Sequence, residues 1–421
     1  MNSKWFEEAR YGLFIHFGLY SKQARGEWVM NKEGLSPAVM TQLAAGFNPE
    51  CFSADAIAEL AVKGGMRYLV FTTMHHDGFR MYQTELSDFC STKMAAHRDF
   101  TAEIIAAARN RGLKVGLYHS LNNWFDQPDS VAALESPEDH ERFIEHTFAR
   151  IQELLTRYNP IDVLWYDGWW PFDAKGWRAE QMNEMVRTIQ PEILFNGRNC
   201  LPGDFATPEQ HVSPPDPWRP WEACVTLGDN WGFHEGDNNW KSPREVIKML
   251  ARCAQGRGNL LLNIGPMGDG SIPAESIGIL EAVGRWLETN GECIFGTDLW
   301  TLDPYAKGAH RGDWSAHGPY TIKANMLYLI ATSPPSGTFA ITGLNGTIRE
   351  AKVLGGEKLR FQQTNDRVEI ESDGRLSSSE GMPRVLRLEC DRQPSIYKTG
   401  GMRVPECEHP RYDPVNADIL W

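Results

Sequence analysis

Residues 114–119 (KVGLYH) and 162–166 (DVLWY) are two short apolar runs, and a helical pattern lies between them. The helical segment begins at Ser136-Pro137-Glu138-Asp139, which resembles a capping box with proline at the first helical position. Apolar residues then follow at the spacing of one helix face: Ile144, Phe148, Ile151 and Leu155. Because both runs are apolar on both faces, they are typical of parallel strands buried between helices. This stretch predicts a strand, a helix and a second parallel strand.

The same alternation extends from the N-terminus to about residue 298. A second capping box begins at Ser242 and precedes another one-face apolar pattern. Further buried strands are expected at residues 12–17, 68–72, 193–196 and 259–264. Repeated β/α units with independently capped helices predict an α/β fold, and we expect a (β/α) barrel of TIM type, in regular or irregular form.

The helical period disappears after about residue 300. Short alternating segments, punctuated by Gly, Asn and Pro, lie at 321–331, 337–341, 349–353, 367–370 and 384–388. These segments predict a small antiparallel β-sandwich. We therefore expect a catalytic barrel over 1–298, a β-sandwich over 299–393 and an irregular C-terminal arm over 394–421.

Composition and charge restrict the class of protein. The 421 residues include 42% hydrophobic residues and 15 Trp, so the chain is expected to fold around a large core. The net charge of −13 repels nucleic acid and anionic membranes, and no apolar run approaches the roughly 18 residues of a membrane-spanning helix. The eight cysteines are scattered and the N-terminus lacks a secretory pattern. We expect reduced thiols and a cytoplasmic location, whereas the oligomeric state is not predicted.

Polar residues follow the apolar runs, at the barrel end where catalytic groups gather. These residues are His16, His75, His76, Asp77, Tyr118, His119, Asp167, Asn196, Arg198 and Asn263. Asp167 stands out because it ends a buried strand, is followed by glycine and lies among Trp165, Trp169 and Trp170. A desolvated carboxylate at the edge of a cavity suits a nucleophile, and aromatic faces commonly wall a sugar. The alternative is an Asp that caps a helix or a turn.

A glycosidase that retains anomeric configuration needs a second carboxyl about 5–5.5 Å from the first. Glu209, in GDFATPEQ (203–210), and Glu222, in PWEAC (220–224), are the candidates in the next polar loop. Spacing alone does not separate them, and either can form a structural ion pair instead.

The histidines allow two interpretations. His16 and His75 together with Asp167 could bind a catalytic metal, since His and Asp at strand ends also build zinc sites. Hydrogen bonding to a polyhydroxylated ligand is the favoured interpretation, and Glu27-Trp28 offers an acceptor beside an aromatic wall in the same way. The glycine-rich segment 265–270 (GPMGDG) lacks the order of a dinucleotide loop and is interpreted as a tight turn. We expect neither a metal nor a cofactor.

Several separated motifs resemble those of the α-L-fucosidases of glycoside hydrolase family 29. The resemblance covers about residues 4–300 and rests on GLFIHFGLYS (12–21), GEWV (26–29), TTMHHDGF (72–79), GLYHSLNNW (116–124), DVLWYDG (162–168), NGR (196–198), GDFATPEQ (203–210) and GNLLLNIGPMGDG (258–270). The resemblance implies a retaining exo-acting enzyme that removes terminal α-L-fucose from fucosylated oligosaccharides or glycoconjugates through a covalent fucosyl-aspartate.

The matched positions imply roles for individual residues. Asp167 matches the nucleophile, and Glu209 matches the acid/base, with Glu222 as the alternative in relatives that have a Trp-Glu pair. The fucose pocket is matched by His16, Glu27, Trp28, His75, His76, Tyr118 and Arg198, and Phe233 is expected to meet the C6 methyl group. Competing hypotheses are a glycosidase for a similar sugar such as an α-galactoside, a metal-dependent hydrolase, and a sugar-binding module without activity.

Overall fold

The computed structural model describes residues 3–215, 218–298, 316–379 and 381–396. The chain divides into two compact units, Met1–Gly296 and Thr297–Trp421. From residue 397 onward, the expected C-terminal arm lies outside the described residues.

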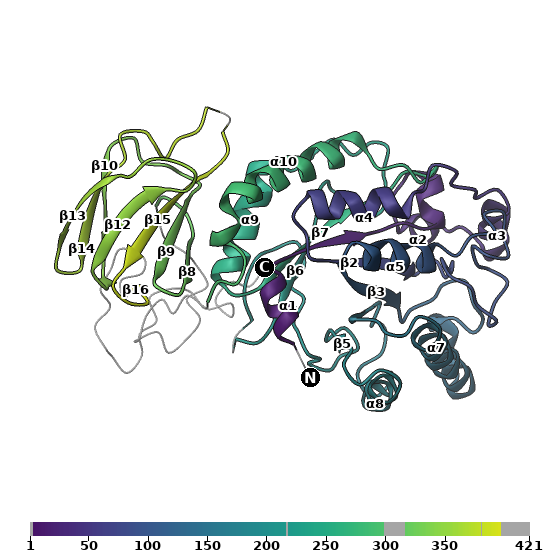
Figure 1. Ribbon diagram of the computed structural model, residues 1–421. Coiled ribbons are helices and arrows are strands. Elements are labelled where there is room, and N and C mark those ends of the chain that lie inside the picture. The colour runs from purple at the N-terminus through teal and green to yellow at the C-terminus, as the bar shows by residue number, and fades with distance from the viewer. Residues whose placement is uncertain (1–2, 216–217, 299–315, 380, 397–421) are drawn as a thin grey trace. The chain divides into compact units, whose positions relative to one another are not determined.

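The first unit is built on a curled sheet of seven parallel strands (Figure 1). Their order is β5-β4-β3-β2-β1-β7-β6. The strands are β1 (Tyr11–Ile15), β2 (Tyr68–Met74), β3 (Lys114–Ser120), β4 (Val163–Asp167), β5 (Leu194–Phe195), β6 (Glu222–Thr226) and β7 (Asn259–Ile264). Each of the six predicted runs overlaps a strand. Strand β6 was missed because it begins with a charged residue and follows a proline-rich loop.

An irregular segment closes the gap between β5 and β6. The backbone nitrogen of Asp204 donates to Phe195 O at 2.8 Å, on the side of β5. On the other side, Glu222 N donates to Ala206 O and Gln210 N donates to Cys224 O, each at 2.9 Å. The segment 204–210 therefore takes the place of an eighth strand, so Glu209 lies on the barrel wall rather than in the free loop expected from sequence.

Helices pack around the outside of these strands (Figure 1). They are α1 (Lys4–Ala9), α2 (Val29–Lys32), α3 (Pro37–Ala44), α4 (Ala54–Lys63), α5 (Phe100–Asn110), α6 (Ser130–Glu135), α7 (Pro137–Arg157), α8 (Ala179–Ile189), α9 (Pro243–Gln255) and α10 (Ala274–Asn290), with 3₁₀ turns η1 (Leu19–Gln23) and η2 (Gly291–Cys293). The capping signals are confirmed: Ser136 accepts from Asp139 N at the start of α7, and Ser242 and Glu245 form a reciprocal capping box before α9.

The barrel interior is filled from below by large aromatic side chains. Phe6 of α1 lies 4.6 Å from the ring of Phe205, between ring centroids, and both are buried. The same cluster includes Phe14, Tyr68, Tyr118 and Trp165. Burial of each such side chain contributes about 1.5–3 kcal/mol to folding, so the lower barrel is a largely aromatic packed core.

The second unit is an antiparallel β-sandwich. Its sheets have the orders β12-β15-β9-β8, β10-β14-β13 and β11-β16. The strands are β8 (Tyr320–Lys323), β9 (Met326–Ala331), β10 (Thr338–Thr342), β11 (Leu344–Asn345), β12 (Ile348–Val353), β13 (Arg360–Thr364), β14 (Arg367–Glu371), β15 (Arg384–Cys390) and β16 (Ser395–Ile396). The single strand predicted over 321–331 is a hairpin, since Ala324 turns the chain at a φ of 52°. Strand β13 was missed because its sequence, RFQQT, is mostly polar.

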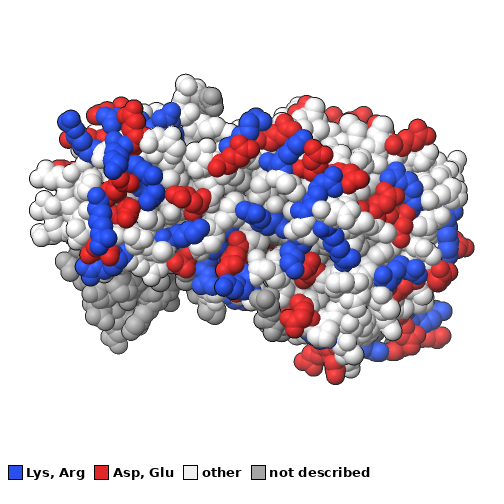
Figure 2. Space-filling view, viewed as in Figure 1, with Lys and Arg blue, Asp and Glu red and all other residues white. Residues whose placement is uncertain are grey.

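Charges of both signs are interspersed on the face shown in Figure 2. That face shows no large acidic patch. All seven cysteines in the described part of the chain are free thiols. Within the same residues, every helix is too short or too polar to cross a lipid bilayer.

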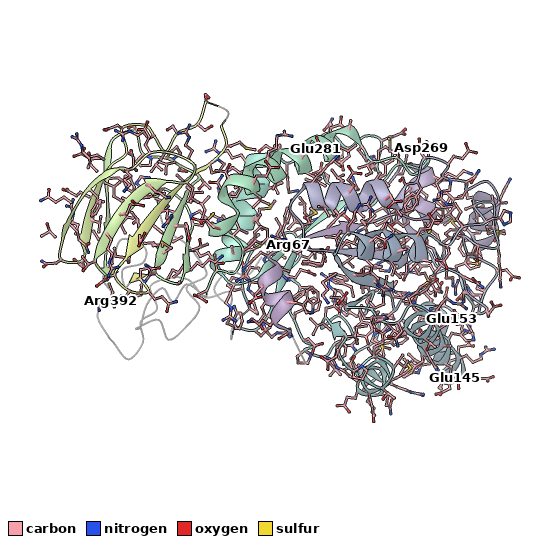
Figure 3. All side chains as sticks on the ribbon, viewed as in Figure 1. Arg67, Glu145, Glu153, Asp269, Glu281 and Arg392 are labelled. Carbon is pink, nitrogen blue, oxygen red and sulfur yellow. The ribbon has the colours of Figure 1, made fainter. Side chains whose placement is uncertain are left out.

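The glycine-rich segment after β7 is a tight turn, as expected. Asp269, labelled in Figure 3, accepts hydrogen bonds from the backbone and hydroxyl of Ser271. Gly270 has a φ of +90°, and a Cβ atom there would lie 2.5 Å from Phe52. This geometry requires glycine at position 270.

Candidate active site

A cavity of about 200 Å³ opens at the carboxyl ends of the barrel strands. It contains two carboxylates, three imidazoles, one guanidinium and several aromatic rings. The lining residues are Phe14, His16, Trp28, His75, His76, Tyr118, Trp165, Asp167, Trp169, Trp170, Arg198, Glu209 and Trp231. Ten residues were expected as nucleophile, acid/base or fucose pocket, and eight of them line this one cavity.

Asp167 is the last residue of β4, and its side chain is held from two sides. Tyr118 donates its hydroxyl to Oδ2 at 2.8 Å, and Arg198 Nη1 donates to Oδ1 at 3.0 Å. Burial opposes ionisation of this carboxyl, but the charge of Arg198 and these hydrogen bonds outweigh it and hold the pKa of Asp167 below its usual value. The carboxylate is therefore anionic, fixed in direction and only 9% exposed as a residue.

Arg198 connects this carboxylate to the second one. Its Nη2 donates to Glu209 Oε2 at 2.7 Å, and its Nε donates to Thr207 at 3.1 Å. The guanidinium also lies over the ring of Trp165, with its central carbon 4.6 Å from the ring centroid. The Glu209 side chain is 40% exposed. One guanidinium therefore holds a buried carboxylate and a solvent-accessible carboxylate at the same cavity.

Neighbouring side chains determine which ring nitrogen carries the proton in His16 and His76. Asn263 Nδ2 donates to Trp231 O, so its Oδ1 accepts from His16 Nδ1 at 2.6 Å. Ser120 donates to Asn122 O, so its Oγ accepts from His76 Nδ1, also at 2.6 Å. Both rings are left with an acceptor at Nε2. His76 Nε2 lies 3.8 Å from Asp167 Oδ2, so this acceptor faces the carboxylate.

These histidines are neutral over the working pH range of most enzymes. Burial lowers the pKa of His16 to about 3 and that of His76 to about 4. Burial, followed by the proximity of the other two rings, also lowers the pKa of His75. Neutral imidazoles with one free acceptor suit hydrogen bonding to the hydroxyl groups of an uncharged ligand.

Aromatic rings form the walls of the cavity. Trp28 and Trp170 are stacked with ring centroids 5.6 Å apart, and Trp231 lies 5.0 Å from the ring of His16. Trp124, outside the cavity lining, packs edge-on against Trp28 at 5.1 Å. These apolar faces can cover the C–H faces of a pyranose ring while the imidazoles bind its hydroxyls.

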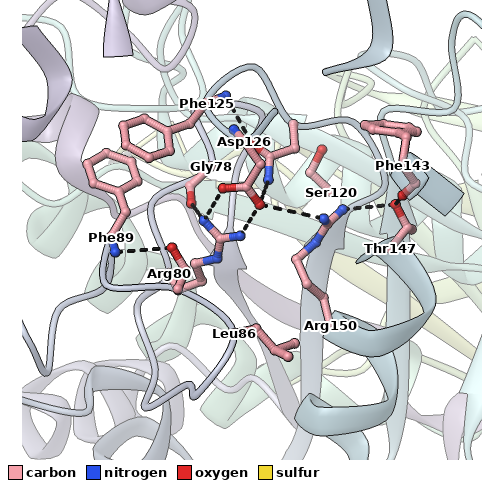
Figure 4. A network of polar contacts seen from close by, with 12 residues as sticks. Gly78, Arg80, Leu86, Phe89, Ser120, Phe125, Asp126, Phe143, Thr147 and Arg150 are labelled. Carbon is pink, nitrogen blue, oxygen red and sulfur yellow. Dashed lines mark hydrogen bonds and ion pairs between the residues drawn. The ribbon is translucent and has the colours of Figure 1, made fainter. Parts of the chain in front are cut away.

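A buried ion network fixes the loop that carries Trp124 (Figure 4). Asp126 accepts two hydrogen bonds from the guanidinium of Arg80 and lies 3.9 Å from Arg150 Nη1. Asn123 Nδ2 donates to the same carboxylate at 2.9 Å. Because both arginines are buried, this one carboxylate compensates two charges and anchors the loop after β3 behind the aromatic wall.

Four polar residues predicted at strand ends have structural partners instead. Asp77 accepts from the backbone nitrogen of Phe79 at 3.1 Å, and His119 bonds to Thr73 at 3.0 Å. Asn196 accepts from the backbone of Tyr166, and Asn263 supports His16 as described above. All four are buried and positioned by the barrel itself.

Two residues expected in the fucose pocket lie beside the cavity rather than in its lining. Glu27 accepts from the backbone nitrogen of Gly232 at 2.8 Å and is almost fully buried. It therefore anchors the segment that carries Trp231. Phe233 lines a small neighbouring cavity together with Trp231 and Gly232. Trp231, which the sequence reasoning had not selected, occupies the cavity wall, and its position in a Trp-Gly-Phe segment was the available signal.

Glu222, the alternative acid/base, lies below the cavity in β6. It is fully buried, accepts from Trp165 Nε1 at 3.0 Å and also accepts from the hydroxyl of Tyr68. Burial raises its pKa to about 7. Trp165 in turn stacks on Tyr118 and lies under the guanidinium of Arg198. Glu222 therefore influences the site indirectly, by holding Trp165 in place. The cavity lining contains Glu209 and not Glu222.

The metal hypothesis can be tested against the donor atoms. One atom each from His75, His76 and Asp167 lies within 4.8 Å of the others, so the set includes His76 in place of the expected His16. However, Arg198 already forms an ion pair with Asp167. A divalent cation on the same carboxylate would face that fixed positive charge, which disfavours binding.

The profile of the Alpha-L-fucosidase family matches residues 1–292. The tissue alpha-L-fucosidase of Rattus norvegicus is 31% identical over 329 residues, which cover 71% of each chain.

Among solved structures, alpha-L-fucosidase isoenzyme 1 from Paenibacillus thiaminolyticus aligns over 92% of this chain and 98% of its own, with a TM-score of 0.82 and 33% identity. An alpha-L-fucosidase from Bacteroides thetaiotaomicron, solved as a trapped covalent intermediate with 2-fluoro-fucosyl fluoride in a Glu-to-Gln variant, aligns over 91% and 94% with a TM-score of 0.79 and 25% identity. A covalent intermediate is the signature of retention. The chain belongs to the alpha-L-fucosidase family and is a retaining α-L-fucosidase.

Proposed function

We propose that Asp167 is the nucleophile and Glu209 the acid/base in exo-acting hydrolysis of terminal α-L-fucose from oligosaccharides or glycoconjugates. The observation that carries the proposal is the shared guanidinium, because Arg198 binds both carboxylates at one cavity. The buried carboxylate suits covalent attack, and the exposed one can exchange protons with water and with a leaving group.

In the first step, a carboxylate oxygen of Asp167 attacks the anomeric carbon of fucose. The bond from that carbon to the leaving oxygen breaks, and the leaving oxygen takes the proton of Glu209. Tyr118 and Arg198 hold the attacking carboxylate in its direction, so little reorganisation is needed to reach the transition state.

The second step releases the sugar from Asp167. Glu209 has given its proton to the leaving oxygen in the first step, so it now acts as a base. Glu209 then removes a proton from water, the water oxygen bonds to the anomeric carbon, and the ester bond breaks. Arg198 keeps both carboxyl groups at the cavity through the two steps.

Recognition of the sugar is assigned to the remaining lining groups. His16, His75 and His76 offer neutral ring nitrogens to hydroxyl groups, while Trp28 and Trp231 cover apolar faces. The small volume of the cavity supports binding of a single terminal sugar, and hence exo action. The substrate partner is a fucosylated saccharide, and the free cysteines support a reducing, cytoplasmic location that cell fractionation would test.

Azide rescue of alanine variants tests the two roles with an activated aryl α-L-fucoside. Asp167→Ala should lose roughly 10⁴-fold or more in rate and, with azide, form the inverted β-fucosyl azide. Glu209→Ala should cleave the activated substrate and, with azide, form the retained α-fucosyl azide. Rescue to the α product in Glu222→Ala alone would reassign the acid/base.

A further inference from the structure

A second, larger cavity adjoins the catalytic one. Its volume is about 450 Å³, and it shares Trp169, Arg198 and Glu209 with the catalytic cavity. Because Glu209 forms part of both walls, the space beyond it is where the leaving group of a bound fucoside must extend. This assignment rests on the proposed function of Glu209 as acid/base.

Arg219 gives this cavity an unusual charge. Its Nη1 donates to the backbone oxygens of Pro202 and Gly203. The described residues provide no acceptor for its Nε and Nη2 and no carboxylate partner. Partial burial lowers the pKa of Arg219. A guanidinium that no described carboxylate balances is available to bind an anion.

The other lining groups do not neutralise that charge. Glu209 is the acidic residue among those that line the cavity, and it is already paired with Arg198. His211 adds an exposed imidazole, and Trp169 presents a ring that is 38% exposed. The cavity lining therefore combines the exposed ring of Trp169 with the guanidinium of Arg219, which has no carboxylate partner among the described residues.

We propose that this cavity is the leaving-group subsite and that it accepts a saccharide bearing an acidic group, a carboxylate or a sulfate ester, which Arg219 binds. A sugar ring of the leaving group stacks on Trp169 and brings its glycosidic oxygen to Glu209. Guanidinium groups bind planar and multi-oxygen anions through paired hydrogen bonds, which is the geometry that Nε and Nη2 of one arginine provide.

The test uses matched aryl α-L-fucosides. One pair carries a carboxylate or a carboxamide beside the nitro group of the 4-nitrophenyl leaving group, and a second pair carries a sulfonate or a sulfonamide. The readout is the ratio of kcat/KM for the anionic to the neutral member. For Arg219→Gln we expect this ratio to fall roughly tenfold relative to the unaltered enzyme, the usual loss for one charge-assisted hydrogen bond.

Two further variants separate charge from shape. Arg219→Lys keeps the positive charge and, in each pair, should retain at least about a third of the unaltered enzyme's ratio of anionic to neutral kcat/KM. Arg285→Gln is the matched control, because Arg285 is an exposed residue of α10 that pairs with Glu281, which is labelled in Figure 3, and its replacement should leave the ratio unchanged. The ratio for the carboxylate pair is then compared with the ratio for the sulfonate pair. The pair with the larger ratio shows whether the subsite prefers a carboxylate or a sulfate-like anion.

The outcomes distinguish this inference from the proposed function. If the unaltered enzyme cleaves none of the fucosides, the proposed function fails. If it cleaves them all but the ratio is the same in Arg219→Gln, Arg219→Lys and the unaltered enzyme, only the anionic subsite is overturned. A ratio that falls in Arg219→Gln and recovers in Arg219→Lys supports the subsite.

Discussion

Arg198 Nη1 lies 3.0 Å from Asp167 Oδ1 at the carboxyl end of the barrel strands, and this ion pair favours the ionised form of the buried carboxyl. It lowers the pKa of Asp167 against the opposing effect of burial. The same guanidinium also pairs with Glu209, so it links the two carboxylates at one cavity. Its charge favours the ionised form of Asp167 although that side chain is buried.

Replacement of Arg198 by Gln should raise the pKa of Asp167, because burial would then act without an opposing charge. The acid limb of the pH profile of kcat/KM should move to higher pH, since the proposed nucleophile must be ionised. We also expect a loss of about 10²–10³-fold at the optimum, typical for removal of a fixed electrostatic group. For Arg198→Lys, both the acid limb and the rate at the optimum should lie between those of the unaltered enzyme and those of Arg198→Gln. An acid limb at the same pH in all three proteins would contradict this role.

The buried Glu222 predicts a pH-dependent stability. Its folded pKa of about 7 lies above the usual 4.5, so between these values the folded protein keeps a proton that the unfolded chain has lost. Wild-type stability should therefore fall with rising pH in this window, relative to Glu222→Gln, by at most about 3 kcal/mol. Urea unfolding of both proteins from pH 4.5 to 8 measures the difference. If the unfolding free energies of the two proteins change in parallel with pH between 4.5 and 7, the pKa of Glu222 is not raised.

Asp126 predicts a large effect on stability. Asp126→Asn leaves Arg80 and Arg150 buried without a carboxylate, and breaking such a network typically costs about 3–5 kcal/mol. The looser loop should also raise KM for an aryl fucoside more than it lowers kcat, because Trp124 backs the wall of the pocket. The matched control is Glu59→Gln, which breaks an exposed pair and should leave the thermal midpoint unchanged. Equal midpoints for both variants would contradict the network's role.

Removal of metals should not change the rate. Arg198 already supplies a positive charge to Asp167, so the cluster of His75, His76 and Asp167 is not expected to need a cation. Activity after extensive dialysis against a chelator should equal that of the untreated enzyme. A loss that added zinc restores, together with bound zinc by elemental analysis, would favour the metal-dependent mechanism.

The sequence predicted the parts of the fold that depend on local pattern. Runs that are apolar on both faces marked six strands, and Ser136 and Ser242 marked the starts of two helices. The closing segment 204–210 was not predictable, because its strand-like role comes from pairing with β5 and β6 rather than from its own pattern. For the same reason Glu222 resembled a loop acid until the structure placed it inside the barrel.

The site was predictable where a residue follows a strand directly. His16, Asp167 and Arg198 converge because the carboxyl ends of parallel strands meet at one edge of the barrel. The positions of Glu27 and Phe233 depend instead on how the segment 231–233 folds over the barrel end, which no local pattern encodes. Trp231 was overlooked for the same reason.

The central claim is that Asp167 bonds covalently to fucose. The most direct measurement is to incubate the enzyme with 2-fluoro-fucosyl fluoride, digest it, and locate the added mass by peptide mapping. We predict a single fucosyl ester on Asp167, in the peptide that contains DVLWYDG (162–168). A label on Glu209, Glu222 or any other residue, with Asp167 unmodified in an inactivated enzyme, would contradict the account.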